Sequence, residues 1–138
     1  MNISLKYDYP PSVDNMYKKN RQGKIYLKRE AVQYKQDIGL LARSAMNKAD
    51  FIMTKRPIRL TIEEHIYINS KQDENYEQDI DNGVKVIQDG LEGVVYKNDK
   101  QIRSLRVKKY LRKEEGKSYR DNYVYIDITD DDTSYNVL

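Results

Sequence analysis

The chain of 138 residues has a formal net charge of +3, is 38% hydrophobic and 34% charged, and contains thirteen tyrosines but no cysteine. This length suits one compact domain, and the lack of cysteine excludes disulfides and thiolate metal sites. The sequence shows no apolar leader and nothing near the roughly 18 apolar residues of a membrane span, so we expect a soluble, cytoplasmic protein with no membrane partner.

The net charge is unevenly distributed along the chain. Four aspartates lie in the last twelve residues, which contain no Lys or Arg, so residues 1–126 carry 25 basic and 18 acidic groups. A basic body with an acidic tail fits a polyanionic partner, although charge that serves solubility alone explains the same totals. We expect one domain, residues 1–128, followed by a disordered acidic tail, residues 129–138.

The first third of the chain predicts a strand, a basic loop and a helix. Residues 3–9 alternate apolar and polar side chains and end at two prolines, as a strand does. In the loop that follows, tyrosines alternate with basic residues, a mixture found in nucleic-acid contacts and also in ordinary solvated loops. We predict DNA contacts from its basic residues Lys18, Lys19, Arg21 and Lys24. Helical spacing over residues 28–47 then predicts a buried stripe of Ala31, Val32, Ile38, Leu41, Ala42 and Ala45.

Residues 57–70 predict a strand with one apolar and one polar face. The apolar face consists of Leu60, Ile62, Ile66 and Ile68, and the polar face of Arg59, Thr61, Glu63, His65 and Tyr67. His65 is the single histidine, and we favour a hydrogen-bonded structural role for it over that of a catalytic base. Residues 69–78 lack periodicity and are expected to form a loop.

The second half of the chain predicts another helix and two strands. Ile80, Val84, Ile87 and Leu91 form one stripe of a helix that begins near Asp79 and that Gly93 can end. Residues 101–112 and 119–128 alternate as strands do. Long basic side chains on the first of these strands either protect a sheet edge or contact DNA, and we predict DNA contacts for Arg103, Arg106 and Lys108.

Acidic residues gather around the second predicted helix. Asp81, Lys85 and Asp89 share the helix face opposite the apolar stripe, and Asp79 lies at the start of the helix. A short helix and a reversing turn would bring Asp99 back to them. Capping or surface pairing explains each acid alone, whereas the set fits a divalent hard cation such as Mg²⁺.

The surroundings of these acids favour one kind of chemistry without excluding others. An EF-hand does not fit, because Val84 and Gly90 occupy the positions that need Gly and Glu. Acids within a basic body point to a polyanionic substrate brought to a metal, with Lys85 placed to stabilise developing charge. A metal-dependent phosphodiesterase is therefore one interpretation, and a binding module is another.

Several short motifs follow one another in the second half of the chain: Asp79-Ile80-Asp81-Asn82, Lys85, Asp89-Gly90-Leu91, Gly93-Val94-Val95, and Asn98-Asp99 with Gln101-Ile102. In order and spacing they resemble the RusA family of phage-encoded Holliday junction resolvases. Residues 10–35 are also similar, more weakly, and the resemblance covers roughly residues 3–110.

The resemblance implies a small α+β domain with about four strands in a mixed sheet and two main helices. It implies a homodimer of phage or prophage origin that nicks four-way DNA junctions in symmetric pairs during recombination and repair, with Mg²⁺ or Mn²⁺ as cofactor. Carried over by position, the metal-binding carboxylates are Asp79, Asp81 and Asp99, Lys85 is the catalytic lysine, and Asp89 has a supporting role. Two alternatives stay open: a non-catalytic protein that binds branched DNA, and a metal-dependent nuclease acting on flaps or RNA.

The chain departs from the family pattern at three positions. Gln78 stands where an arginine often precedes the first aspartate, Gly83 replaces a leucine, and Asn98 replaces the first of two adjacent acids. We expect Gly83 to weaken its helix by roughly 0.5–1 kcal/mol relative to Ala. We expect Asn98 to weaken a second metal position.

Overall fold

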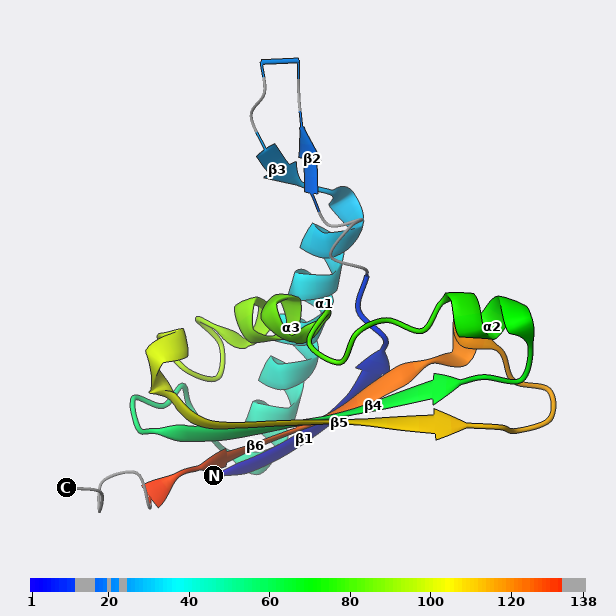
Figure 1. The fold of residues 1–138 in the computed structure, drawn as a ribbon. Coiled ribbons are helices and arrows are strands. Elements are labelled where there is room, and N and C mark those ends of the chain that lie inside the picture. Colours follow the sequence, from blue (N-terminus) through cyan, green and yellow to red (C-terminus); the bar gives the residue numbers. More distant parts are fainter. Residues whose placement is uncertain (12–16, 20, 23–24, 133–138) are drawn as a thin grey trace.

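The computed structural model describes residues 1–11, 17–19, 21–22 and 25–132 (Figure 1). For strands β2 and β3 it describes the backbone. The elements, in chain order, are β1 (Asn2–Asp8), β2 (Tyr17–Lys19), β3 (Ile25–Leu27), α1 (Arg29–Ala49), β4 (Ile58–Tyr67), α2 (Lys71–Asn75), α3 (Val84–Leu91), η2 (Asp99–Gln101), β5 (Ile102–Arg112), η3 (Tyr119–Asp121) and β6 (Tyr123–Asp130).

Four strands form one mixed sheet in the order β1-β6-β4-β5. β6 pairs antiparallel with both β1 and β4, whereas β4 and β5 run parallel. α1 and α3 lie on one face of this sheet, and a separate hairpin of β2 and β3 projects from the body beyond the start of α1 (Figure 1). The predicted α+β domain, with a four-stranded mixed sheet and two main helices, is confirmed.

The core lies between the sheet and α1. Every second residue of β4, starting from Ile58, faces the helices, and α1 buries Ala31, Tyr34, Ile38, Ala42 and Met46 against them. Val32 and Leu41, expected in the buried stripe, are exposed instead. The reason is that the buried stripe is narrower than expected: it runs along Ala31, Ile38 and Ala42, and at helical spacing Val32 and Leu41 lie on its two opposite flanks.

Two glycines allow α1 and α3 to approach each other closely. A Cβ atom on Gly39 would lie 3.2 Å from the Gly90 carbonyl oxygen, and one on Gly90 would lie 3.1 Å from the Lys35 carbonyl oxygen. Larger side chains at this crossing would push the helices apart. The crossing therefore fixes α3, and the acids that it carries, over the sheet.

Two differences from the expected elements occur before α3. Residues 71–75, expected to be part of a loop, form α2, because Ser70 and Asp73 build a capping box at its start. α3 begins at Val84 rather than near Asp79, so Ile80 precedes the helix and is exposed. The sequence pattern could not distinguish a turn that continues the helical spacing from the helix itself.

The end of the domain lies beyond the expected boundary at residue 128. β6 continues to Asp130, which pairs with the N-terminal amine at 2.9 Å. Asp131 is buried, and its backbone N–H donates to the Pro57 carbonyl oxygen. The first residues of the expected tail are therefore part of the fold, whereas residues 133–138 lie outside the described part of the chain. Within the described part, no helix is long and apolar enough to cross a membrane.

Candidate active site

Residues 77–83, which we call the acidic turn, connect α2 to α3 and carry Asp79 and Asp81. The Asn82 backbone N–H donates to the Asp79 carbonyl oxygen at 3.0 Å, and the Val84 N–H donates to that of Asp81 at 3.2 Å. The Asn82 side-chain amide donates to Gln78 Oε1. Asp79 and Asp81 are both exposed. Gln78 thus closes the acidic turn through its own side chain.

Gly83 is required by a close contact with the N-terminal segment. A Cβ atom at this position would lie 2.1 Å from Pro10 Cγ. Gly83 is also the N-cap of α3 rather than an interior residue, so the expected cost to the helix does not arise there. The sequence-based expectation for Gly83 was wrong in sign, since alanine would collide with Pro10.

Lys85 links α3 to the segment that carries Asp99. Its Nζ atom lies 2.8 Å from Asp99 Oδ2 and 3.0 Å from Asp89 Oδ1. The hydrogen bonds that the Lys85 ammonium donates to Asp99 and Asp89 raise the pKa of Lys85 above its ordinary range. The structure therefore brings together three of the predicted site residues.

Asn98 holds Asp99 in place by capping η2. Its side chain accepts a hydrogen bond from the Lys100 N–H at 2.8 Å, while Gln101 Oε1 accepts from the Asn98 N–H at 2.9 Å. The Gln101 side chain also donates to the Thr54 and Arg56 carbonyl oxygens. An asparagine at position 98 thus anchors the turn on which Asp99 sits.

A third acid, Glu92, joins Asp89 and Asp99. Oxygen atoms of the three carboxylates lie within 4.8 Å of one another. Local desolvation and the neighbouring Asp99 and Asp89 carboxylates raise the pKa of Glu92. Asp99 Oδ1 is buried and has no hydrogen-bond partner among the described residues. Such a set of oxygen donors fits a hard divalent cation.

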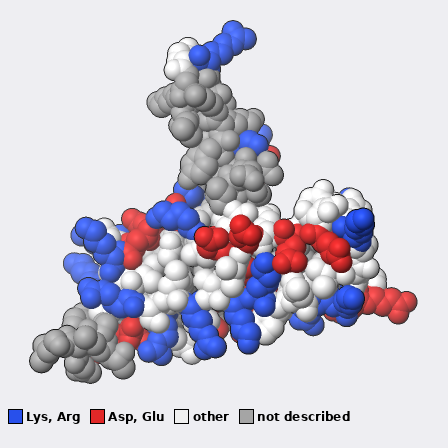
Figure 2. Space-filling model, viewed as in Figure 1, with Lys and Arg blue, Asp and Glu red and all other residues white. Residues whose placement is uncertain are grey.

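Sequence reasoning did not include Glu92, and it grouped the acids differently. Glu92 follows Asp89 by three residues at the end of α3, which was the available signal. Asp79 and Asp81 are not members of the group that the structure assembles around Asp99. Figure 2 shows acidic side chains in a row along the side of the molecule that bears α3 and the acidic turn, with basic side chains below them over β5.

A buried glutamate lies on the helix side of β4. Glu64 is 1% exposed, and its Oε1 atom has no hydrogen-bond partner among the described residues. Burial raises the pKa of Glu64 to about 7, an effect that the charge of Lys109 opposes and that of Asp81 adds to. The sequence signal was a charged residue in the apolar phase of the strand, between Ile62 and Ile66.

The basic residues predicted to contact DNA occupy different parts of the surface. Arg103 is exposed near Asp99, and its Nε donates to the Lys100 carbonyl oxygen at 3.2 Å. Arg106 and Lys108 are exposed on the sheet face opposite α1 and α3, since Lys108 pairs in register with Glu63 of the polar face. Arg21 is exposed at the turn of the hairpin, Lys18 and Lys19 lie in β2, and Lys24 lies outside the described residues.

His65 lies on the open face of the sheet, away from the acids. Its ring stacks between Tyr123 at 4.6 Å and Tyr110 at 4.9 Å. A ring nitrogen is 3.4 Å from Glu63 Oε1, and the other is 3.3 Å from Arg112 Nη1. These contacts fit the structural role favoured for His65.

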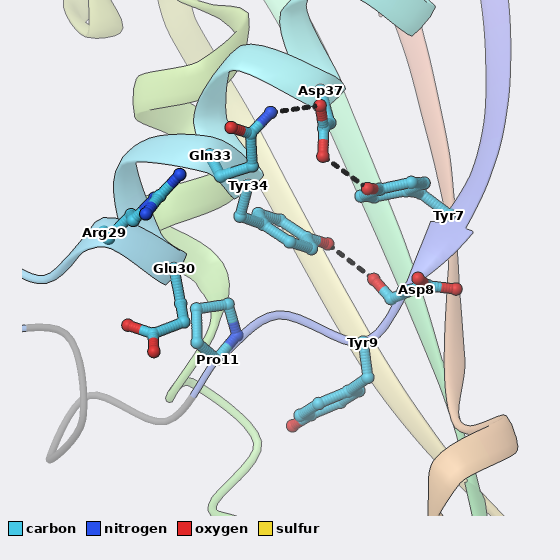
Figure 3. A pocket seen from close by; sticks show the side chains of 9 residues that line it. All are labelled: Tyr7, Asp8, Tyr9, Pro11, Arg29, Glu30, Gln33, Tyr34 and Asp37. Atoms are coloured by element: carbon cyan, nitrogen blue, oxygen red, sulfur yellow. Dashed lines mark hydrogen bonds between the residues drawn. The ribbon is translucent and has the colours of Figure 1, made fainter.

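A cavity of about 460 Å³ lies between the end of β1 and the first half of α1 (Figure 3). Tyr7 Oη donates to Asp37 Oδ2 at 2.7 Å, and Tyr34 Oη donates to the Asp8 carbonyl oxygen at 2.7 Å. The hydrogen bond with Asp37 raises the pKa of Tyr7 to about 12. The described residues that line this cavity include none of the acids discussed above, so we treat it as separate from the site.

A protein-family model matches most of the chain. The family model described as Endodeoxyribonuclease RusA matches residues 8–128, which include the acidic turn, α3, η2 and all of β4 and β5. No curated protein matches the chain. Because the family match extends over most of the sequence, the protein belongs to the RusA family of endodeoxyribonucleases, hydrolases that cut DNA internally.

Proposed function

We propose that this protein is an Mg²⁺-dependent, structure-selective endonuclease that resolves four-way DNA junctions by paired nicks. Membership of the RusA family supports cleavage of DNA. The observation that carries the proposal is the convergence of Lys85 on Asp99 and Asp89, with Glu92 beside them. A cation and a group of carboxylates at one exposed point are what cleavage of a phosphodiester with a divalent metal needs.

Lys85 can act on the substrate from its present position. An ammonium group has three N–H donors, and two of the three are engaged with Asp99 and Asp89. The side chain is 65% exposed, so the remaining donor is open to a phosphate oxygen. We assign to Lys85 the stabilisation of negative charge that develops on the phosphate or on the leaving oxygen.

The carboxylates that we propose as metal ligands are Asp79, Asp81 and Asp99. When bound, Mg²⁺ would neutralise charge on the scissile phosphate and lower the pKa of a nearby water, and Mn²⁺ could replace it. Asp99 also belongs to the group with Asp89 and Glu92, so two sets of acids share one residue. We assign the first set to metal binding and a supporting role to Asp89.

Metal titration distinguishes the two sets. Binding of Mn²⁺, measured by electron paramagnetic resonance without DNA, should weaken by about tenfold or more in Asp81→Asn and Asp99→Asn and change little in Glu92→Gln. A loss of Mn²⁺ affinity confined to Glu92→Gln and Asp99→Asn would instead place the ion within the second set, which consists of Asp89, Glu92 and Asp99.

A junction assay tests the function itself. The purified protein is incubated with a labelled immobile four-way junction, with its linear duplex arms, and with flap and RNA substrates, in Mg²⁺ or in EDTA. We expect paired, Mg²⁺-dependent nicks in the junction alone, and we expect Asp81→Asn to bind the junction without cutting it. Tight binding without nicks by the parent would favour a non-catalytic protein that binds branched DNA. Cleavage of flaps or RNA alone would favour a metal-dependent nuclease that acts on those substrates.

We also propose that the active form is a homodimer, because two symmetric nicks need two active sites related by a two-fold axis. The mass of the protein in complex with one junction, measured by light scattering, should correspond to two chains per junction. One chain per junction would contradict this part of the proposal.

A further inference from the structure

The acidic turn is attached to the sheet by Lys109. This residue lies in β5, and its side chain reaches the helix side of the sheet, where its Nζ atom donates to the Gln78 carbonyl oxygen at 2.6 Å. Nζ also lies 3.0 Å from Glu77 Oε2, and the side chain is only 19% exposed. The Gln78 carbonyl belongs to the same peptide group as the Asp79 nitrogen. Lys109 therefore fixes the peptide with which the Asp79–Asp81 motif begins.

The charges near Lys109 explain why a cation is needed there. Glu77 pairs with Lys109 directly, and Glu64, its partner in register on β4, is buried beside it. The charge of Asp81 raises the pKa of Glu64, while the charge of Lys109 lowers it. Acids at this density repel one another and would move the turn outward if nothing cationic lay under it.

We propose that Lys109 is a positioning residue that holds the acidic turn against β5 and so sets the location of Asp79 and Asp81. The Lys109 ammonium contacts the backbone of the turn and Glu77, and it does not lie on the solvent-facing side of the turn. Any effect of Lys109 on a bound metal therefore comes through the positions of Asp79 and Asp81. The assignment of those aspartates to metal binding rests on the proposed function, whereas the attachment of the turn does not.

The neighbouring residue offers a matched control. Lys108 precedes Lys109 in β5 and points to the opposite face of the sheet, where its Nζ lies 4.9 Å from the centre of the Tyr110 ring. Lys108→Met and Lys109→Met remove the same charge from adjacent positions of one strand. A difference between the two variants therefore reports the contact with the turn and not the loss of a positive charge.

The first experiment is amide hydrogen exchange of the full chain, followed by mass spectrometry. In the parent, the Asn82 and Val84 amides are protected by hydrogen bonds within and at the end of the turn. In Lys109→Met, peptides that cover residues 77–84 should exchange about tenfold faster or more, while peptides from β6 and α1 keep their rates. Lys108→Met should leave residues 77–84 unchanged, and Lys109→Arg should restore part of the protection.

The second experiment measures Mn²⁺ binding by electron paramagnetic resonance in the same variants, without DNA. We expect weaker binding in Lys109→Met, parental binding in Lys108→Met and partial recovery in Lys109→Arg. If Lys109→Met loses protection along the whole chain, Lys109→Gln replaces it, and faster exchange at residues 77–84 is again required.

The outcomes separate this inference from the proposed function. Unchanged exchange at residues 77–84 in Lys109→Met would overturn the positioning role, whatever the protein cleaves. Faster exchange with unchanged Mn²⁺ affinity would restrict Lys109 to holding the turn and would remove Asp79 and Asp81 from the metal site. A parent that cuts no branched DNA would refute the proposed function and leave the exchange result standing.

Discussion

Lys85 Nζ lies 2.8 Å from Asp99 Oδ2, so one ion pair joins α3 to η2 across fourteen residues of sequence. The return of the chain between them depends on Tyr96, which is fully buried and whose hydroxyl donates to the Gln88 carbonyl oxygen at 2.7 Å. Backbone bridges from Tyr96 to Thr54 and Glu92 hold the same loop. The site is thus assembled by a short helix and a loop anchored in the core.

This geometry predicts the effect of removing the ammonium. Lys85→Met should lower the rate of junction cleavage by about 10²–10³-fold, because a donor aimed at developing charge is lost. Its stability should change by less than about 1 kcal/mol, since an exposed ion pair contributes little. Single-turnover cleavage and urea unfolding measure the two quantities.

Lys100→Met is the control for Lys85→Met, because Lys100 is an exposed lysine next to Asp99. It should cleave at close to the parental rate. Equal losses in both variants would mean that Lys85 contributes only general positive charge near the DNA.

The contact between Gly83 and Pro10 predicts that an ordinarily favourable substitution destabilises this protein. Gly83→Ala should lower the free energy of unfolding by about 1–3 kcal/mol, because the new methyl group collides with the Pro10 ring. The cost should shrink in the Pro10→Ala background, where the ring is absent. A double-mutant cycle in urea measures this coupling, and additive effects of the two changes would contradict the contact.

Strong periodic patterns were sufficient to predict most of the fold. The alternation in β4 and the stripe of α3 from Val84 onward reflect burial against one face, which the sequence records directly. The start of α3 was less predictable, because the acidic turn continues the helical spacing of Ile80 while its backbone is held by Gln78 and Asn82.

The site was predictable where spacing alone determines contact. Lys85 and Asp89 are one helical turn apart, and Asp99 meets them after a short return. The roles of Gly83 and Lys109 depend on Pro10 and Gln78, which approach from distant parts of the chain. Contacts of that kind leave no local pattern, so residues that looked like departures from the family are structural partners in this chain.

The buried Glu64 predicts a pH-dependent loss of stability. Its pKa in the folded protein is raised from 4.5 to about 7, so between these values the folded state holds a proton that the unfolded state has released. The contribution of Glu64 to the free energy of unfolding is therefore fully present below pH 4.5 and is lost as the pH rises through 7. Glu64→Gln, which cannot ionise, should gain about 1–3 kcal/mol over the parent between pH 5 and pH 8.

Urea unfolding at several pH values measures this difference between Glu64→Gln and the parent. The control is Glu115→Gln, since Glu115 is exposed. It should follow the parent at every pH. Parallel curves for Glu64→Gln and the parent would show that Glu64 does not titrate in this range.

The basic residues of β5 predict how DNA lies on the molecule. Each cation that neutralises a phosphate of duplex DNA contributes about 0.9 to the slope of the logarithm of binding against the logarithm of salt concentration. We expect Arg103→Gln, Arg106→Gln and Lys108→Gln each to lower that slope by about this amount for a four-way junction. Because β5 is an edge strand, DNA bound near Asp99 could reach both faces of the sheet around it. A lower slope in Arg103→Gln alone would instead exclude from the DNA contact the sheet face that bears Arg106 and Lys108.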